Sequence, residues 1–306
     1  MKPIVSVRLM VYQNAPYIRE CIDSVLMQQT DFLFEICIGE DGSTDGTREI
    51  CLEYQKKYPD IVKVFLWNRT LPEHRALPPS RYNFINTIKN CQGKYIALLD
   101  GDDYWIDPHK LQRQVDFLDA NPDYILCYHN AKIIDENGNV VSESKMPEVG
   151  KKDYTSDEII RGSTNILTLS LLFRNVIKEF PPEMKNVKNG DNFLTSMLGN
   201  YGKGKFMPEI TPGVYRTHGA GVWSTLDNNN RLLSKITTYF WLHLYYERIG
   251  KKSHADYYIL RIKRLLEDKV PSPTNKNQHI FNSKSYKIGR AITYPYRFIM
   301  RMKNLL

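Results

Sequence analysis

Residues 95–103 read Tyr-Ile-Ala-Leu-Leu-Asp-Gly-Asp-Asp, and this stretch is the most informative segment of the chain. Five residues typical of a buried strand are followed at once by Asp100, Asp102 and Asp103. Burying three unpaired carboxylates is prohibitive, so they must face solvent, a cation or a cleft at the strand end. In an extended segment Asp100 and Asp102 point the same way, which presents two oxygen ligands suited to Mg²⁺ or Mn²⁺. An acidic turn that caps the helix expected near Pro108 is the alternative.

Strands and helices alternate over the first hundred residues. Short apolar strands are expected at 4–10, 34–38, 62–66 and 95–99, and helices at 15–29, 47–58 and 81–90. This alternation predicts an α/β fold with a mostly parallel central sheet flanked by helices. Ligands on such sheets bind beyond the carboxyl ends of the strands, where the acidic loops 39–46 and 100–103 lie.

The remainder of the chain is less regular. We expect a helix after Asp107-Pro108, a hairpin from 124–134 and 140–141 joined through Asn137-Gly138, a capping box at 155–158, a buried strand at 166–173, helices at 226–248 and 254–266, and a linker at 270–283. Gly190-Asp191 opens an apolar helical stretch, in which Asp191 is either an N-cap or a general base.

Composition indicates a globular protein with a full hydrophobic core. The chain has 306 residues, of which 42% are hydrophobic and 25% charged. Residues 1–220 carry 26 basic and 29 acidic side chains, net −3, whereas residues 221–306 carry 16 and 5, net +11. Residues 284–306 combine six basic side chains with interleaved aromatics and no acidic residue. This segment predicts contact with an anionic membrane surface, with packing on the folded domain as the alternative.

Several classes of protein are disfavoured. The five cysteines show no CxxC spacing, so we expect buried thiols in a reducing compartment and no disulfides. No segment approaches the roughly 20 apolar residues of a spanning helix, which predicts a cytoplasmic protein, at most peripheral to the inner face of the cell membrane. Dinucleotide-binding GxGxxG, P-loop and nucleophile-elbow patterns are absent, and no nucleic-acid recognition fold accompanies the basic charge.

Two further loops have residue types suited to binding. Residues 39–46 read Gly-Glu-Asp-Gly-Ser-Thr-Asp-Gly, in which a carboxylate can accept hydrogen bonds from a ribose hydroxyl or a base N–H. A capped turn is the alternative. Residues 215–218 read Tyr-Arg-Thr-His before a glycine, so His218 is expected on a loop, where it either ligates a metal, binds a phosphate or is structural.

These loops, in this order, resemble the inverting glycosyltransferases of family 2, which have the GT-A fold and build bacterial polysaccharides. Residues 5–29 are similar to the family's opening strand, Tyr-Asn turn and helix, and residues 39–47 to its Asp-Asp-Gly-Ser-Thr-Asp-Gly-Thr, with Glu40 in place of the first Asp. Residues 93–103 match its DxD strand. The resemblance covers 3–128 strongly and the segments around Asp191 and His218 more thinly.

The resemblance implies roles for the donor-binding residues. Tyr12 would lie beside the nucleotide base, which Asp41 would hold together with Glu40. Asp100 and Asp102 would bind the ribose, the metal and the diphosphate.

Three further residues take roles by the same resemblance. His218 would ligate the metal or the diphosphate, and Arg216 would contact a phosphate. Asp191 would be the catalytic base, although Gly190 precedes it where the family usually shows Glu.

The implied reaction moves a sugar from a nucleoside-diphosphate sugar, UDP by default, to a hydroxyl of a glycan or lipid-linked glycan, with Mn²⁺ or Mg²⁺ as cofactor and inversion at the anomeric carbon. The implied organisation is a GT-A catalytic domain at 1–225, a helical extension at 226–269, a linker at 270–283 and a basic segment at 284–306. A sugar-nucleotide nucleotidyltransferase and a non-catalytic carbohydrate- or partner-binding module are the alternatives. The loops 69–80 and 146–165 are expected to select the substrates.

Overall fold

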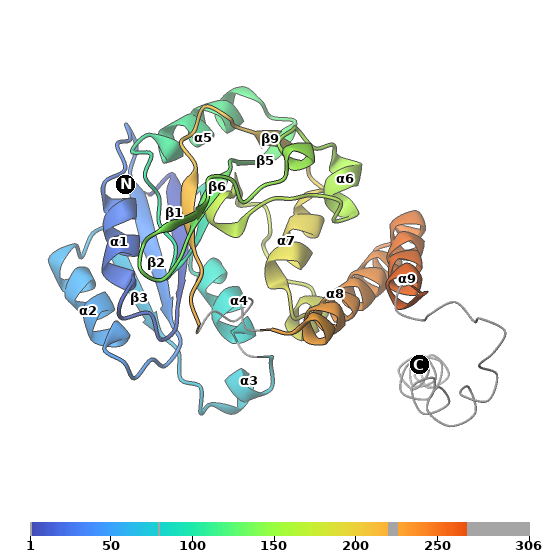
Figure 1. The fold of residues 1–306 in the computed structure, drawn as a ribbon, viewed down its shortest axis with the longest axis horizontal. Helices are drawn as coiled ribbons and strands as arrows, with labels where there is room; N and C mark the ends of the chain where they lie inside the picture. Colours follow the sequence, from blue (N-terminus) through green and yellow to red (C-terminus); the bar gives the residue numbers. More distant parts are fainter. Residues whose placement is uncertain (1, 79, 220–225, 268–306) are drawn as a thin grey trace. The chain divides into compact units, whose positions relative to one another are not determined.

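The fold is built around a seven-stranded sheet. Figure 1 shows helices around this sheet in a computed structural model, which describes residues 2–78, 80–219 and 226–267. Its strands lie in the order β3 (Val62–Leu66), β2 (Phe34–Glu40), β1 (Val5–Val11), β4 (Tyr95–Asp100), β8 (Leu172–Arg174), β5 (Tyr124–Tyr128) and β9 (Lys203–Phe206). The first four strands are mutually parallel, and β8 runs antiparallel to its neighbours β4 and β5. The predicted mostly parallel α/β sheet is therefore confirmed.

Helices cover both faces of this sheet and bury a separate apolar cluster on each. One face packs against α1 (Ile18–Leu26), α2 (Thr47–Lys57) and α5 (Lys110–Ala120). The other packs against α4 (Arg81–Lys89), α6 (Ser156–Ile160) and α7 (Gly190–Leu198), and the short helix α3 (Pro72–Arg75) precedes α4 in the sequence. Strand β1 shows the period-2 pattern that such a layer requires, since Val5, Val7, Leu9 and Val11 all belong to the first cluster.

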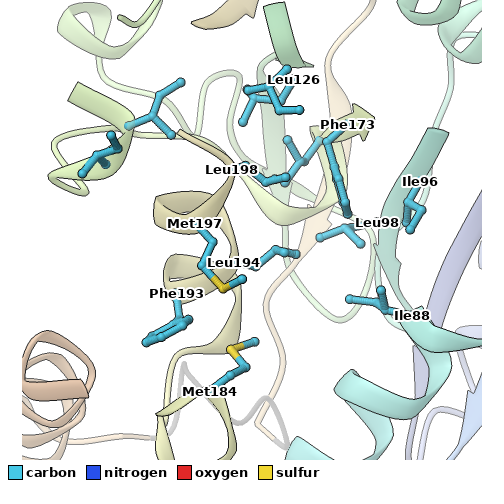
Figure 2. Close-up of a cluster of buried hydrophobic side chains, with 14 of the residues drawn as sticks. Ile88, Ile96, Leu98, Leu126, Phe173, Met184, Phe193, Leu194, Met197 and Leu198 are labelled. Atoms are coloured by element: carbon cyan, nitrogen blue, oxygen red, sulfur yellow. The ribbon is translucent and has the colours of Figure 1, made fainter. Parts of the chain in front are cut away.

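The apolar side of α7 fixes this helix against the sheet. Figure 2 shows Leu194 and Leu198 of α7 directed toward Leu98 of β4 and Phe173 of β8. These side chains are buried, as are Phe193 and Met197 on the same helix. This packing fixes the position of α7, including its first turn, relative to the end of β4, where the acidic loop begins.

The predicted hairpin lies in a second, three-stranded sheet, and its first strand is shorter than expected. Its order is β10 (Gly213–Arg216), β6 (Ala131–Ile134) and β7 (Val140–Ser142), so β6 and β7 do form an antiparallel hairpin. The expected continuous strand 124–134 is wrong, because β5 ends at Tyr128 and belongs to the larger sheet. The break has a polar cause: the Asn130 side chain accepts a hydrogen bond from Met146 N and donates one to Ser144 Oγ, which turns the chain out of the sheet.

Two other boundaries differ from expectation. The buried strand expected at 166–173 is confined to β8, because residues 168–170 form a 3₁₀ turn in which Ser170 Oγ donates to Leu167 O. Helix α5 begins at Lys110, two residues after Pro108, and the Asp107 carboxylate accepts a hydrogen bond from His109 N.

The capping box at Thr155 and Glu158 is confirmed, with both reciprocal hydrogen bonds present.

The predicted C-terminal helices are present as α8 (Asn228–Arg248) and α9 (Lys252–Glu267). Asp227 caps α8 by accepting a hydrogen bond from Asn230 N, and Tyr246 of α8 donates to the carbonyl of Ser196 in α7. The chain divides into two compact units, residues 1–262 and 263–306. The linker at 270–283 and the basic segment at 284–306 lie outside the described residues.

All five cysteines are buried and unpaired. Among the helices that the structure describes, none is long and apolar enough to span a bilayer.

Candidate active site

The predicted residues lie at the carboxyl ends of the central strands. Tyr12 follows β1, Asp41 follows Glu40 at the end of β2, and Asp100 ends β4. Asp191 occupies the first turn of α7, and residues 217–218 follow Arg216 at the end of β10 in the three-stranded sheet. The directions of β1, β2 and β4 therefore bring Tyr12, Asp41 and Asp100 to one edge of the large sheet, as expected for a parallel α/β fold.

Asp102 and His218, two of the predicted metal ligands, are in contact. The Oδ2 atom of Asp102 lies 3.0 Å from Nε2 of His218. This hydrogen bond raises the pKa of His218, because the carboxylate stabilises the imidazolium. The ring of Tyr17 lies 5.1 Å from the His218 ring and limits its movement. A carboxylate and an imidazole are thus presented together at the end of β10.

Asp100 is held by a buried arginine from the neighbouring strand. Arg8 Nη1 donates to Asp100 Oδ1 at 3.1 Å, and Arg8 is fully buried while the Asp100 side chain keeps 41% of its surface exposed. Desolvation raises the pKa of Asp100, the charge of Arg8 opposes this, and the charges of Asp102 and Asp191 add to the increase. The last effect indicates that the three carboxylates share one electrostatic environment.

The donor set fits a hard divalent cation shared with a ligand. Among the described residues no three His, Cys, Asp or Glu side chains are grouped closely enough to hold a metal ion by themselves. Mg²⁺ is commonly bound by only one or two carboxylates, with substrate phosphates and waters completing its shell. Asp102, together with either Asp100 or His218, would supply the protein ligands of such a site, and phosphate oxygens would supply the rest.

Arg216 braces the acidic loop from β10. Its backbone N–H donates to Asp103 Oδ1 at 3.0 Å, and its guanidinium donates to Asp102 O at 3.3 Å and to Glu20 Oε2 at 2.5 Å. The guanidinium also lies 4.6 Å from the ring centroid of Tyr17. Burial and the neighbouring carboxylates raise the pKa of Asp103, the third carboxylate of the acidic loop. Arg216 and Asp103 therefore fix the geometry of the loop that bears Asp102.

An open cavity of about 420 Å³ adjoins this brace. Its lining residues are Pro16, Tyr17, Glu20, Tyr104, Ile134, Glu136, Asn137, Gly138 and Arg216.

Asp41 is buried between two basic side chains. Arg69 Nη2 donates to Asp41 Oδ2 at 2.7 Å, and Nε2 of His74 lies 2.7 Å from Asp41 Oδ1. The Arg69 guanidinium also lies 3.5 Å from the ring centroid of Tyr12, which is 42% exposed. The structure thus brings the two predicted base-binding residues together, with Arg69 between them.

Glu40 faces the turn that follows β2. Its side chain is fully buried, Oε1 accepts a hydrogen bond from Ser43 N at 2.5 Å, and Oε2 pairs with Arg48 Nε at 2.7 Å. Both oxygens of Glu40 are therefore occupied in holding the loop that carries Asp41.

Asp191 is not an N-cap. The N-cap position of α7 is Asn189, and Asp191 lies one residue inside the helix, where Oδ2 accepts a hydrogen bond from Thr168 Oγ1 at 3.3 Å. A glycine precedes Asp191 for a steric reason: a Cβ at Gly190 would lie 1.7 Å from Nη1 of Arg81. Arg81 therefore occupies the space in which a larger residue would stand.

Sequence reasoning gave no role to Arg8 or Arg81, whereas Arg69 and His74 fall in the loop 69–80 that it expected to select the substrates. For Arg8 there was a signal, because a charged residue between Val7 and Leu9 interrupts a mostly apolar strand. Arg81 donates from α4 to carbonyls more than a hundred residues away, and nothing in its local sequence indicates it.

The sheet order, the helices on both faces and the acidic cluster at the strand ends define a GT-A type of α/β protein. Residues 6–180 match the sequence profile of glycosyl transferase family 2, which is more than half of the chain. The chain belongs to this family.

Relatives and solved structures agree with this assignment. An uncharacterized protein of Mycobacterium tuberculosis is 32% identical over 220 residues, covering 72% of this chain and 60% of that protein. A putative teichuronic acid biosynthesis glycosyltransferase of Bacillus subtilis, TuaG, is 36% identical over 117 residues, covering 38% of this chain and 42% of that one. The S. aureus protein TarS, crystallised with UDP-GlcNAc, superposes with a TM-score of 0.58 at 19% identity over 87% of this chain and 72% of TarS.

The TarS likeness establishes a shared fold. The chain spans about 60% of the length of the mycobacterial relative.

Proposed function

We propose that this protein transfers a sugar from a nucleoside-diphosphate sugar to a hydroxyl of a glycan or lipid-linked glycan, with a divalent cation and with inversion at the anomeric carbon. The observation that carries this proposal is that Asp191, in the first turn of α7, lies close enough to Asp100 for its charge to raise the pKa of that carboxyl group. UDP is the default carrier. Membership of family 2 and the UDP-sugar complex of a protein with the same fold support the choice of donor.

The donor would span the edge of the sheet. Its base would lie at Tyr12 and Asp41, where Arg69 must shift to admit it, and its diphosphate would lie at Asp100 and Asp102. A Mg²⁺ or Mn²⁺ ion bound there with His218 would offset charge on the departing diphosphate.

Asp191 would accept the proton of the acceptor hydroxyl. Thr168 donates to Oδ2 of Asp191, and among the described residues we find no donor to Oδ1. That oxygen is thus left for an acceptor hydroxyl. Attack from this side on an α-linked donor would give a β-linked product in a single displacement.

Substitution Asp191→Asn tests the assigned base. The change keeps the size of the side chain and removes its basicity, so transfer should fall by about 100-fold or more while UDP affinity stays near wild type. Steady-state transfer assays and titration calorimetry measure the two quantities. A large loss of UDP binding in this variant would contradict the role.

Titration calorimetry with UDP, GDP and dTDP, in Mn²⁺ and in chelator, separates the proposal from its alternatives. Metal-dependent binding of a nucleoside diphosphate supports transfer, whereas binding of none of the three supports a non-catalytic module. A nucleotidyltransferase would instead turn over a nucleoside triphosphate and a sugar phosphate.

We also propose that residues 284–306 contact an anionic membrane surface, which would suit a lipid-linked acceptor. The support is compositional: six basic side chains, no acidic one and interleaved aromatic residues. Flotation of the full chain and of a chain ending at residue 283 with anionic vesicles tests it. Equal binding by both would contradict it.

A further inference from the structure

The segment just before α7 is held from two sides by side chains of other elements. Arg81 of α4 donates to the carbonyl of Val187 through Nε at 3.2 Å and through Nη2 at 3.1 Å, and to the carbonyl of Lys188 at 3.1 Å. On the other side, Asn189 N donates to Oγ1 of Thr238 in α8 at 3.2 Å. Three consecutive residues, 187–189, are thus each fixed by a side chain distant in the sequence.

Arg81 is well suited to hold this segment rigidly. Its side chain is almost fully buried, and its guanidinium lies 5.1 Å from the ring centroid of Phe84, one turn further along α4. Two nitrogens of one planar group, Nε and Nη2, make three hydrogen bonds to two successive carbonyls, so rotation of the guanidinium would break several of them at once. Burial lowers the pKa of Arg81 to about 10, and the charge of Asp191 opposes this shift. No described carboxylate forms an ion pair with Arg81.

Thr238 is held equally firmly. It is buried in α8, and its hydroxyl donates to the carbonyl of Ser234 one turn earlier at 2.9 Å. Because that hydrogen is used, the oxygen of Thr238 is oriented to accept from Asn189 N. Helix α8 lies beyond residue 180, where the family match ends.

Gly190 completes the arrangement. A Cβ at this position would lie 1.7 Å from Nη1 and 2.5 Å from Cζ of Arg81, so any larger residue must displace the guanidinium. The residue after this glycine is Asp191. A shift of the 187–190 segment would therefore move Asp191 directly.

We propose that Arg81 and Thr238 are positioning residues for Asp191, which clamp the segment 187–190 and so set where the carboxylate stands. The inference rests on the proposed function of Asp191 and goes beyond it, because it assigns a role in transfer to α4 and to the C-terminal helix α8. Small displacements of a catalytic group cost up to about 100-fold in rate, so the clamp should act on kcat.

The first test replaces the arginine. Arg81→Met should lower kcat for sugar transfer by about 10- to 100-fold and leave the affinity for UDP and Mn²⁺ within about twofold, since no donor-binding residue is touched. Arg248→Met is the matched control: Arg248 joins α8 to Glu183 through hydrogen bonds of 2.7 and 3.0 Å but does not reach 187–190. It should keep kcat near wild type. Equal losses of kcat in both variants would overturn the proposal.

The second test uses the glycine to detect coupling. Gly190→Ala in the wild type should lower kcat strongly because the new Cβ displaces the guanidinium. In the Arg81→Met background the same substitution should cost less than about threefold, since the obstructing group is gone. Fully additive losses would contradict the clamp.

The third test addresses α8. Thr238→Val removes the hydroxyl at nearly constant volume and should lower kcat, whereas Thr238→Ser keeps the acceptor and should restore most of it. If the Val and Ser variants have the same kcat, the hydroxyl has no positioning role.

Hydrogen exchange of the full chain separates failure of the clamp from failure of the proposed function. Arg81→Met should speed exchange of the amides of 189–193 relative to both the wild type and Arg248→Met. If Arg81→Met speeds this exchange but the wild-type protein transfers no sugar, the clamp is supported and the proposed role of Asp191 is rejected. Unchanged exchange together with unchanged kcat would reject the clamp.

Discussion

At the scale of single residues, the site depends on buried cations as much as on its carboxylates. The sequence motif identified Asp100, Asp102 and Asp191, because acidic residues directly after a buried strand or at the start of a helix stand out locally. It did not identify Arg81, whose partner carbonyl at Val187 is 106 residues away. Contacts of this kind follow from the packing of α4 against α7 and leave no local pattern.

Arg8→Met should lower sugar transfer without lowering the stability of the fold. Arg8 is fully buried, and its Nε and Nη2 atoms have no hydrogen-bond partner in the described structure, so the side chain is poorly compensated for desolvation. Methionine fills a similar volume, and Asp100 is exposed enough to be hydrated. We expect the free energy of unfolding to stay within about 1 kcal/mol of wild type or to rise, while transfer falls because Asp100 loses its partner. Denaturant unfolding and transfer assays measure both. Unfolding at a much lower denaturant concentration, or full activity, would contradict this account.

Lys110 makes stability depend on pH. This residue is buried, its Nζ donates to Gln114 Oε1 at 2.7 Å and lies 3.9 Å from the ring centroid of Trp105, and burial lowers its pKa to about 7. Between pH 7 and 10 the unfolded chain keeps a proton on Lys110 that the folded protein has lost. Raising the pH therefore favours the folded state by up to about 1.4 kcal/mol per unit from this group.

Lys110→Met removes this dependence. The variant should be more stable than the wild type at pH 7, and the difference should shrink as the pH rises toward 10, as measured by urea unfolding at several pH values. Lys203→Met is the control, because the Lys203 side chain is 51% exposed, and it should track the wild type. A difference that is constant with pH would show that Lys110 stays charged in the fold.

At the scale of elements, the regular βα units were predictable and the irregular ones were not. Strands at 5–11, 34–40, 62–66 and 95–100 and their helices follow the apolar periodicity closely. The break between β5 and β6 was missed because side-chain hydrogen bonds of Asn130 override the β propensity around it. The strand predicted at 166–173 was too long for a similar reason: the Ser170 side chain closes a turn within an apolar run, so only the short β8 forms there.

Docking of α4 on β2 depends on Gly39. A Cβ there would lie 1.9 Å from Asn83 Oδ1 and 2.1 Å from Thr87 Oγ1, so Gly39→Ala must separate α4 from the strand. We expect a loss of about 1–3 kcal/mol in unfolding free energy and weaker UDP binding, because Asp41 lies two residues further on. Gly219→Ala is the matched control, since no atom of the described residues lies within 4 Å of the new Cβ. Equal stability of the two variants in thermal unfolding would contradict the packing argument.

At the scale of the whole molecule, the fold brings five separate segments of the chain together at the carboxyl ends of the central strands. The order of the central strands places β1 between β2 and β4, so Tyr12, Asp41 and Asp100 meet although the sequence separates them. Helix α7 adds Asp191 from one face and the small sheet adds His218. The α/β pattern predicted that the candidate site lies at this edge of the sheet. It could not predict the contact of α8 with the segment before α7, because no local sequence pattern encodes the packing partners of α8.

The most direct test of the central claim is the position of the metal. Crystals of the full chain grown with UDP and Mn²⁺ should show, in anomalous difference maps, manganese bound to Asp102 and to diphosphate oxygens, with Asp100 and His218 adjacent. Manganese elsewhere, with UDP well ordered and both carboxylates turned away from it, would contradict the account.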